Sequence, residues 1–410
     1  MNSAFSLILC RFRPSVQSVF QLLLLRLRCG YPVPSGGGRD DPDITSPRNF
    51  VRLQDMTALL TLRAGPTALA HLRQHGGLRG DQIDIMPGAS GGAKWIGIGG
   101  LDRYLFGHLL QQPRAHPLHL IGSSIGSWRM ACLAQRDPVA ALARGHEAYI
   151  YHQRYTPKPA AREVSDVLAR ALDYLLGEEG VHEILSHPMF RVHVITAEMR
   201  GLAASDRRPV LATAMVLAAA ANVVTRRSLA WQARRTIFHS AGDRSPFLHL
   251  RDLPTVHRTL TPDNLRAALL ASGSIPLLME GVRIPGAPGV HWDGGVTDYH
   301  LDLDYGTGAG LVVYAHFYDH VVPGWFDKSL PWRRAGAANF ARTLLIAPSP
   351  AFLASLPGGR IPDRRDFFDF TQAERMRRWQ TILDASAALG DELHELIETE
   401  RLVEAVVPWT

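Results

Sequence analysis

The order of apolar and polar positions alternates between strand-like and helix-like segments from residue 57 onward. Gln82 to Met86 is a short apolar run closed by Pro87-Gly88, and Lys94 to Leu110 follows with large apolar side chains at helical spacing. Pro117 to Ile121 and Ser124 to Gln135 repeat the same order. Because strand–helix–strand units place their strands in parallel through a right-handed crossover, this pattern predicts an α/β fold with a mainly parallel central sheet.

Later segments predict further strands and helices. The helix that begins at Thr371 carries a capping box with Glu374. Leu211 to Val224 is an alanine-rich apolar run that is too short to span a bilayer, so we expect a buried helix there. The remaining predicted elements are a helix at Thr67 to His75 and strands at Arg191 to Thr196, Thr236 to His239, Val290 to Trp292 and Leu311 to His316.

The pattern divides the chain into three parts. Residues 56–345 are expected to form the α/β domain, with a helical C-terminal region over residues 346–410 packed on it. Residues 1–55 do not fit the alternation, because the apolar run Leu22 to Leu25 is followed at once by arginine and residues 32–49 are rich in proline, glycine, serine and aspartate. We expect this extension to be disordered or to result from a misassigned start of the protein, with a peripheral membrane anchor as the alternative.

Composition narrows the expected environment. Hydrophobic residues make up 46% of the chain and charged residues 20%, which predicts a packed core. The net charge is +6, but the arginines are scattered and form no basic stripe, so nucleic acid is not an expected partner. Weak attraction to anionic lipid headgroups is the alternative interpretation of this charge. Three cysteines make no disulfide framework, and a reducing cytoplasmic location, with possible peripheral contact to a membrane, is expected.

A sharp turn between a predicted strand and a predicted helix carries the first candidate chemistry. It reads Gly122-Ser123-Ser124-Ile125-Gly126, with one glycine two residues before Ser124 and another two residues after it. Such glycines allow a strained turn that lifts the Ser124 hydroxyl above the sheet edge, at a helix N-terminus that favours negative charge. The pattern also occurs at Gly88 to Gly92, so Ser90 is an alternative nucleophile. A glycine-rich turn without any catalytic role remains an alternative interpretation of the Ser124 segment.

The earlier glycine-rich turn is better interpreted as an oxyanion hole. Gly91, Gly92 and Ala93 can present backbone N–H groups to a substrate oxygen, and such donors act on charge that develops in the transition state. Gly92 and Ser124 are 32 residues apart, about the length of one strand–helix–strand unit. The two turns are therefore expected at the same edge of adjacent parallel strands.

With these two turns and Asp293-Gly294-Gly295, the sequence resembles the patatin-like phospholipases over roughly residues 82–300. That family combines a glycine-rich loop ending in a basic residue, here Lys94, a G-x-S-x-G turn and a D-G-G or D-G-A motif. The resemblance implies a three-layer patatin-like fold and a lipid acyl hydrolase that acts on a lipid or other ester without a cofactor or metal. It also implies a Ser–Asp dyad in which Ser124 is the nucleophile and Asp293 the base.

Departures from the family pattern leave parts of the site open. Ser90 replaces a loop glycine, and Trp95 replaces the glycine after the basic residue. Trp128 and Arg129 are bulky side chains directly after the turn that carries Ser124, which is called the elbow below. Lys94 is interpreted either as a headgroup contact or as a surface lysine.

A second register uses a different loop as the oxyanion hole. Ala64-Gly65-Pro66 would supply the hole and Ser90 the nucleophile. It is disfavoured because Pro66 has no N–H.

Three other functions remain as alternatives. An α/β-hydrolase triad would use Ser124, Asp293 and either His316 or His320. A non-catalytic lipid- or partner-binding protein would have tryptophans filling the site, and acyl transfer to an alcohol would use the same acyl-enzyme as hydrolysis.

Two further features have weaker interpretations. The acidic residues Asp298, Asp302 and Asp304 do not follow a calcium-loop pattern and are expected to be solvated. Trp379 lies on an arginine-rich helix, which suggests an interfacial contact of the C-terminal region with lipid.

Overall fold

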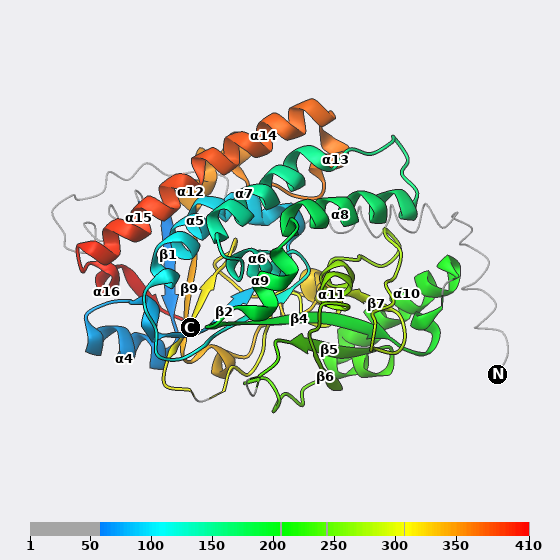
Figure 1. Cartoon of the computed structure of the whole chain (residues 1–410), viewed down its shortest axis with the longest axis horizontal. Coiled ribbons are helices and arrows are strands. Elements are labelled where there is room, and N and C mark those ends of the chain that lie inside the picture. The colour runs from blue at the N-terminus through cyan, green and yellow to red at the C-terminus, as the bar shows by residue number, and fades with distance from the viewer. Residues whose placement is uncertain (1–57, 206, 243–244, 307, 410) are drawn as a thin grey trace, which may run out of the picture.

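The computed structural model describes residues 58–205, 207–242, 245–306 and 308–409, and the predicted N-terminal extension over residues 1–55 lies outside them. A ten-stranded sheet forms the centre, with strand order β10-β1-β9-β8-β2-β3-β4-β5-β6 and β7 beside β4 (Figure 1). The strands are β1 Leu60–Ala64, β2 Ile83–Gly88, β3 Leu118–Ser123, β4 Phe190–Met199, β5 Ala233–His239, β6 Thr255–Thr259, β7 His291–Asp293, β8 Leu311–Ala315, β9 Thr343–Pro348 and β10 Val406–Pro408.

Helices flank this sheet, and the C-terminal ones lie along one side of the molecule in Figure 1. They are α4 Pro66–His75, α5 Gly99–Gly107, α6 Ile125–Leu133, α7 Pro138–Glu147, α8 Ala161–Leu176, α9 Gly180–Ser186, α10 Arg208–Val224, α11 Leu265–Ser272, α12 Pro350–Ser355, α13 Asp366–Asp369, α14 Gln372–Ala385, α15 Ala387–Glu398 and α16 Leu402–Ala405.

The middle of the sheet is parallel, as the sequence predicts. The neighbouring strands β9, β8, β2, β3 and β4 are all parallel to one another, whereas β5 and β7 pair with β4 in the antiparallel sense. Gly88 at the end of β2 is paired with Gly122 near the end of β3. The turns that leave these two strands therefore meet at one edge of the sheet, where ligands of open α/β sheets bind.

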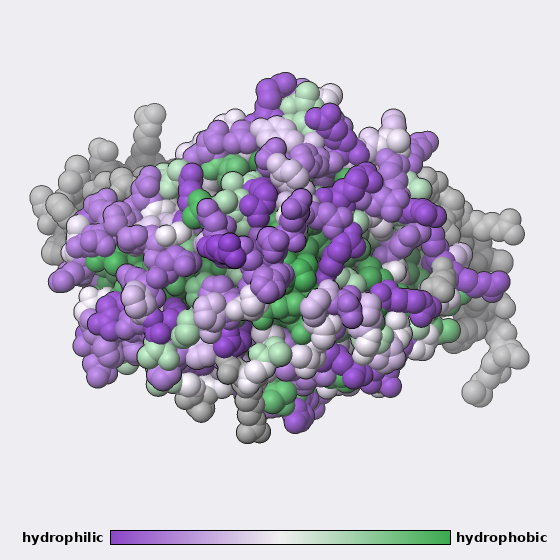
Figure 2. Space-filling view, viewed as in Figure 1, coloured by the Kyte–Doolittle hydropathy of each residue, from purple (hydrophilic) through white to green (hydrophobic). Residues whose placement is uncertain are grey.

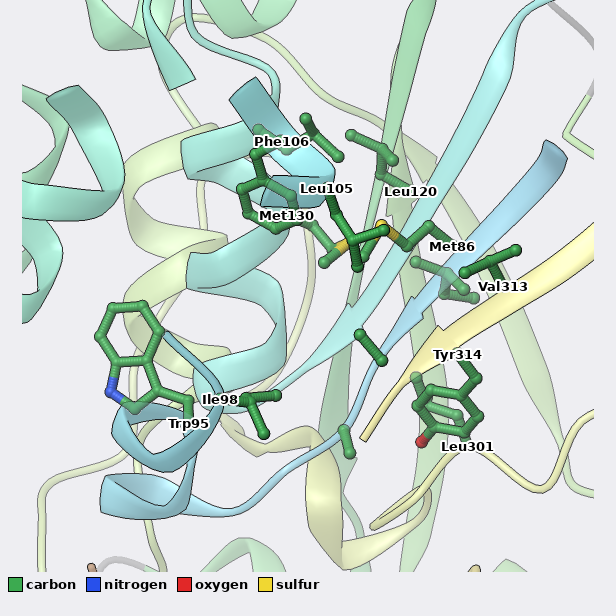
Figure 3. Close-up of a cluster of buried hydrophobic side chains, with 14 of the residues drawn as sticks. Met86, Trp95, Ile98, Leu105, Phe106, Leu120, Met130, Leu301, Val313 and Tyr314 are labelled. Atoms are coloured by element: carbon green, nitrogen blue, oxygen red, sulfur yellow. The ribbon is translucent and has the colours of Figure 1, made fainter. Parts of the chain in front are cut away.

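Apolar side chains from strands and helices hold this edge in place. Met86 and Leu120 from β2 and β3 meet Leu105, Phe106 and Met130 from α5 and α6, and all five are completely buried (Figure 3). Removing such a side chain from water stabilises the fold by about 1.5–3 kcal/mol. The turns that leave β2 and β3 therefore rest on a closely packed base.

The helix predicted over Lys94 to Leu110 is split in the structure. Its first part is the 3-10 helix η2 (Gly92–Ile98), and α5 begins only at Gly99. A side chain at Gly100 would lie 2.1 Å from the backbone oxygen of Ser386, so the C-terminal region approaches this segment at backbone distance.

The C-terminal region shares the sheet with the rest of the chain. Residue 345, the expected boundary, lies inside β9, and β10 pairs with β1 in parallel. The predicted capping box is present, with Thr371 and Glu374 at the start of α14. Trp379 on α14 is completely buried and donates a hydrogen bond to Asp366 at 2.7 Å, so it cannot make the lipid contact suggested by the sequence.

The apolar run predicted as a buried helix forms α10, but only one side of α10 is buried. Leu211, Ala214 and Met215 pack inward, whereas Leu217 is 50% and Val224 is 84% exposed. The expectation of a buried helix holds for the inner side of α10 and was wrong for its outer side, because the rest of the protein lies on one side only. A helix sequence that is apolar on all sides does not show which of those sides other segments will cover.

Candidate active site

Ser124 occupies a strained turn between β3 and α6. Its backbone has φ 54° and ψ −131°, a conformation that a residue other than glycine adopts only where the surrounding structure enforces it. A Cβ at Gly126 would lie 1.9 Å from the oxygen of Gly88, and one at Gly122 would lie 2.4 Å from the backbone of Ser127. The elbow therefore requires glycine at both flanking positions, as the sequence predicts.

A buried serine on α11 fixes the elbow from the other side. Ser272 accepts a hydrogen bond from the Ser124 N–H at 2.9 Å and donates one to the Ile195 oxygen at 2.7 Å. It therefore connects the Ser124 turn to β4. The sequence analysis did not identify this residue, since a serine at a helix end carries no distinctive pattern.

The Ser124 hydroxyl donates a hydrogen bond of 2.7 Å to Oδ2 of Asp293. The other carboxylate oxygen accepts the Gly295 N–H at 2.7 Å. Asp293 ends β7, which pairs with β4 so that Asp293 lies opposite Thr196. On the same edge of β4, Ser123 of β3 pairs with the preceding residue, Ile195, whereas β5 occupies the other edge. Both side chains are nearly buried, with exposed fractions of 8% for Ser124 and 7% for Asp293.

Burial changes the basicity of Asp293. Loss of solvation raises the pKa of Asp293 to about 6, although hydrogen bonds from Ser124 and Gly295 and the charges of Lys328 and Arg364 oppose the rise. An ordinary aspartate has a pKa of about 3.9 and is a poor base. With a pKa near 6, Asp293 remains ionised at neutral pH and accepts a proton more readily.

The loop after β2 places free donors beside the elbow. The N–H groups of Gly91, Gly92 and Ala93 have no hydrogen-bond acceptor among the residues that the structure describes. Ser90 holds the loop instead, because its N–H donates to the Tyr299 oxygen at 2.8 Å and its hydroxyl to Ser123 Oγ at 2.9 Å. The hydroxyl that meets a carboxylate is that of Ser124, not Ser90.

Residues 89–300, just over half of the 410-residue chain, match the family model of the patatin-like phospholipases. The chain belongs to this family. Neither a curated protein nor a solved structure matches it. The match begins at Ala89, beside the glycine-rich loop after β2, and ends after the D-G-G motif, so it includes both turns and Asp293. Family membership establishes a patatin-like α/β fold and a general relation to lipid acyl hydrolases.

Lys94, the basic residue of the family loop, is neither a surface lysine nor a free charge. It is only 8% exposed and forms an ion pair with Asp363. Burial opposes its charge, but Tyr318, Tyr299 and Asp363 together raise the pKa of Lys94 above its ordinary value. The surface interpretation was wrong because the segment around Asp363 folds over the loop.

Two cations near Asp293 lie outside the segment that matches the family. The ammonium of Lys328, on the 3-10 helix η8 (Trp325–Ser329), lies 3.8 Å from the centre of the Tyr299 ring. Burial, followed by the charges of Arg364 and Lys94, lowers the pKa of Lys328 well below its ordinary value. Within the described residues, neither Lys328 nor Arg364 has a carboxylate partner. No local sequence pattern marks them, because folding alone brings them to the site.

The histidines of the alternative triad lie elsewhere. His316 is completely buried and its Nδ1 is 2.7 Å from the Tyr318 oxygen, while His320 is paired with Asp319 at 3.0 Å. In the described part of the chain, no histidine is hydrogen-bonded to Ser124 or to Asp293. The triad is therefore not assembled.

The bulky residues after each turn have structural partners. Trp95 packs on His146 with ring centres 4.4 Å apart, and the Trp128 indole donates to the Leu269 oxygen at 3.0 Å. Arg129 forms a fully buried ion pair with Asp102 at 2.6 Å. These contacts join helical segments to one another, so they give a structural reason for residues that depart from the family pattern.

The three acidic residues after the D-G-G motif do not form one cluster. Asp298 is completely buried and pairs with Arg235 at 2.6 Å, which corrects the expectation that it is solvated. Asp302 accepts from Asn339, and Asp304 lies 3.2 Å from His249. The group of close metal-binding side chains found among the described residues is a different and exposed one, formed by His108, His394 and Glu398.

Proposed function

We propose that this patatin-like protein hydrolyses carboxylic esters of lipids, such as phospholipids or lysophospholipids, through an acyl-enzyme on Ser124. The observation that carries the proposal is the 2.7 Å hydrogen bond from the Ser124 hydroxyl to Asp293, made at a strained elbow. A hydroxyl in contact with a carboxylate is the arrangement that activates a serine nucleophile.

Acylation uses Asp293 as general base. Asp293 takes the hydroxyl proton as Ser124 Oγ attacks the ester carbonyl, and the carbonyl oxygen becomes an oxyanion. The N–H groups of Gly91, Gly92 and Ala93 stabilise that oxyanion, and one such donor contributes roughly 2.7–4 kcal/mol in enzymes of this kind. When the intermediate collapses, the alcohol leaves with the proton from Asp293 and the acyl group stays on Ser124.

Deacylation repeats these steps with water. Asp293 takes a proton from water, the hydroxide attacks the acyl-enzyme, and the fatty acid leaves as Ser124 Oγ regains the proton. A dyad without histidine is chemically adequate here because the raised pKa of Asp293, about 6, lies close to neutral pH.

A fluorophosphonate probe tests this proposal directly. The purified protein is labelled and digested, and the labelled peptide is mapped by mass spectrometry. We expect label on Ser124, complete loss in Ser124→Ala and strong loss in Asp293→Asn. His320→Ala is the matched control, since His320 is exposed and belongs to the triad that is not assembled.

Each other result has a defined meaning. Label on Ser90 would mean that the nucleophile lies on the earlier glycine-rich turn. Loss of labelling in His320→Ala would favour the Ser-Asp-His triad over the dyad. A folded protein that is never labelled would overturn the proposal and favour a binding role.

A further inference from the structure

Exposed apolar side chains are concentrated on and around α10. On the face of the molecule shown in Figure 2, hydrophilic side chains cover most of the surface. Among the described residues, by contrast, six of the ten exposed large hydrophobic side chains fall between residues 202 and 231. They are Leu202, Val216, Leu217, Val223, Val224 and Trp231.

The exposed residues of α10 lie on one face of the helix. At about 100° per residue, Val216, Leu217, Ala220, Val223 and Val224 fall within an arc of about 120°. A surface helix of a protein in water normally presents polar side chains on this face. None of the described helices is long and apolar enough to cross a bilayer, so the apolar face of α10 would lie on a surface rather than span it.

The charges around α10 indicate which surface it fits. Between Arg200 and Trp231 the sequence contains five arginines and a single acidic residue. Arg200, Arg207 and Arg227 are exposed, and none has an ion-pair partner among the described residues. A hydrophobic helix face with arginines at both ends complements a membrane whose headgroups are anionic. Exposed tryptophan such as Trp231 is also typical of a membrane interface.

The inner face of α10 connects this surface to the candidate active site. Leu211, Ala214 and Met215 share a hydrophobic cluster with Trp292 and Val296, the residues on either side of the Asp293-Gly294-Gly295 motif. The outer face of α10 is therefore separated from the neighbours of Asp293 by roughly one helix diameter, about 10–12 Å.

The far end of α10 makes a second connection to the site. Asn222 donates a hydrogen bond of 2.6 Å to Asp327 on η8. The next residue, Lys328, is the cation that lies over the Tyr299 ring.

We propose that the outer face of α10, flanked by Arg200, Arg207 and Arg227, is a docking surface for anionic lipid bilayers. When α10 is bound to the bilayer, the Asp293 side of the candidate active site lies next to the membrane that contains the proposed substrate. This role does not depend on catalysis by Ser124, so binding and hydrolysis are tested separately.

Vesicle flotation of the full-length Ser124→Ala protein measures binding without consuming lipid. The vesicles contain equal amounts of phosphatidylcholine and phosphatidylglycerol. We expect the double variant Leu217→Glu, Val224→Glu to lose about tenfold or more in affinity, because two apolar side chains that would insert among the lipids become negative charges beside anionic headgroups. Phe368→Glu is the matched control, since Phe368 is 78% exposed on α13, away from α10, and its binding should be unchanged.

The arginines are tested in the same assay. Arg200→Gln with Arg227→Gln should weaken binding to the anionic vesicles by about fivefold per charge, and the remaining binding should depend less on salt. Thermal unfolding should be unchanged for all of these variants, because the substituted side chains are exposed.

Several outcomes would overturn the proposal. One is equal vesicle binding by the parent and the Leu217→Glu, Val224→Glu variant. A second is binding that appears only after residues 1–55 are removed, which would mean that this extension covers α10. A third is a dimer in light scattering that the α10 variant abolishes while vesicle binding persists, which would assign the face to a second copy of the chain.

Discussion

At the scale of single residues, the candidate site joins the Ser124 hydroxyl to a carboxylate whose pKa is raised by burial. Ser124 and Asp293 are 169 positions apart in sequence and meet because β4 pairs with both β3 and β7. Their local motifs could be predicted, since glycine is required wherever the backbone is strained or closely approached. Ser272, Lys328 and Arg364 could not, because their roles depend on which segments fold against the elbow.

Replacing the base tests the role of this contact. Asp293→Asn keeps the size of the side chain but removes its ability to accept a proton. We expect kcat/KM toward a soluble short-chain ester to fall by about 10²- to 10⁴-fold, the usual contribution of a general base. An unchanged rate would contradict the dyad, and circular dichroism with thermal unfolding would show that the variant is folded.

The raised pKa of Asp293 predicts the pH profile. Protonated Asp293 cannot accept the Ser124 proton, so the rate should rise by about tenfold per pH unit below pH 6 and level off above it. Arg364 lowers the pKa of Asp293, so Arg364→Gln should move the midpoint to higher pH by less than about one unit. A profile that is flat from pH 4 to 8 would exclude Asp293 as the titrating base.

At the scale of elements, buried ion pairs join helices that the sequence shows only as separate segments. Arg129 on α6 and Asp102 on α5 are both completely buried, so the pair connects the helix after the Ser124 turn to the helix after the glycine-rich loop. The sequence identified Arg129 only as a bulky departure. Its partner could not be predicted, because the pairing follows from the packing of α5 against α6.

Removing one partner of this pair should be costly. Asp102→Ala leaves the Arg129 guanidinium buried without its counter-ion, and we expect the free energy of unfolding to fall by about 3–5 kcal/mol. Asp81→Ala breaks an exposed pair with Arg79 and should cost about 0–1 kcal/mol. Urea unfolding compares the two, and equal losses would contradict the structural role of the buried pair.

At the scale of the whole molecule, the C-terminal region completes the α/β core. β10 extends the sheet beside β1, and Trp379 on α14 is completely buried by the segments that pack against that helix. Figure 1 shows α14 and α15 lying across the same side of the molecule as α5 and α7. Substitutions in this region should therefore affect the stability of the entire fold.

Trp379→Ala tests this integration. Loss of a completely buried tryptophan should reduce the free energy of unfolding by about 3–5 kcal/mol in a single transition. Phe368→Ala, which changes a side chain that is 78% exposed, should alter it by less than about 0.5 kcal/mol. A separate early transition in the Trp379 variant would instead mean that residues 346–410 unfold independently.

The sequence by itself determined the two glycine turns, the Asp293 motif and their order, and therefore the family and the parallel sheet. These features could be predicted because strained turns and hydrophobic periodicity are local properties of the chain. Only the tertiary structure decided that Lys94 is paired, that Trp379 is buried and that one face of α10 is exposed. Each of these depends on which distant segment covers the residue, and periodicity along the chain carries no information about that segment.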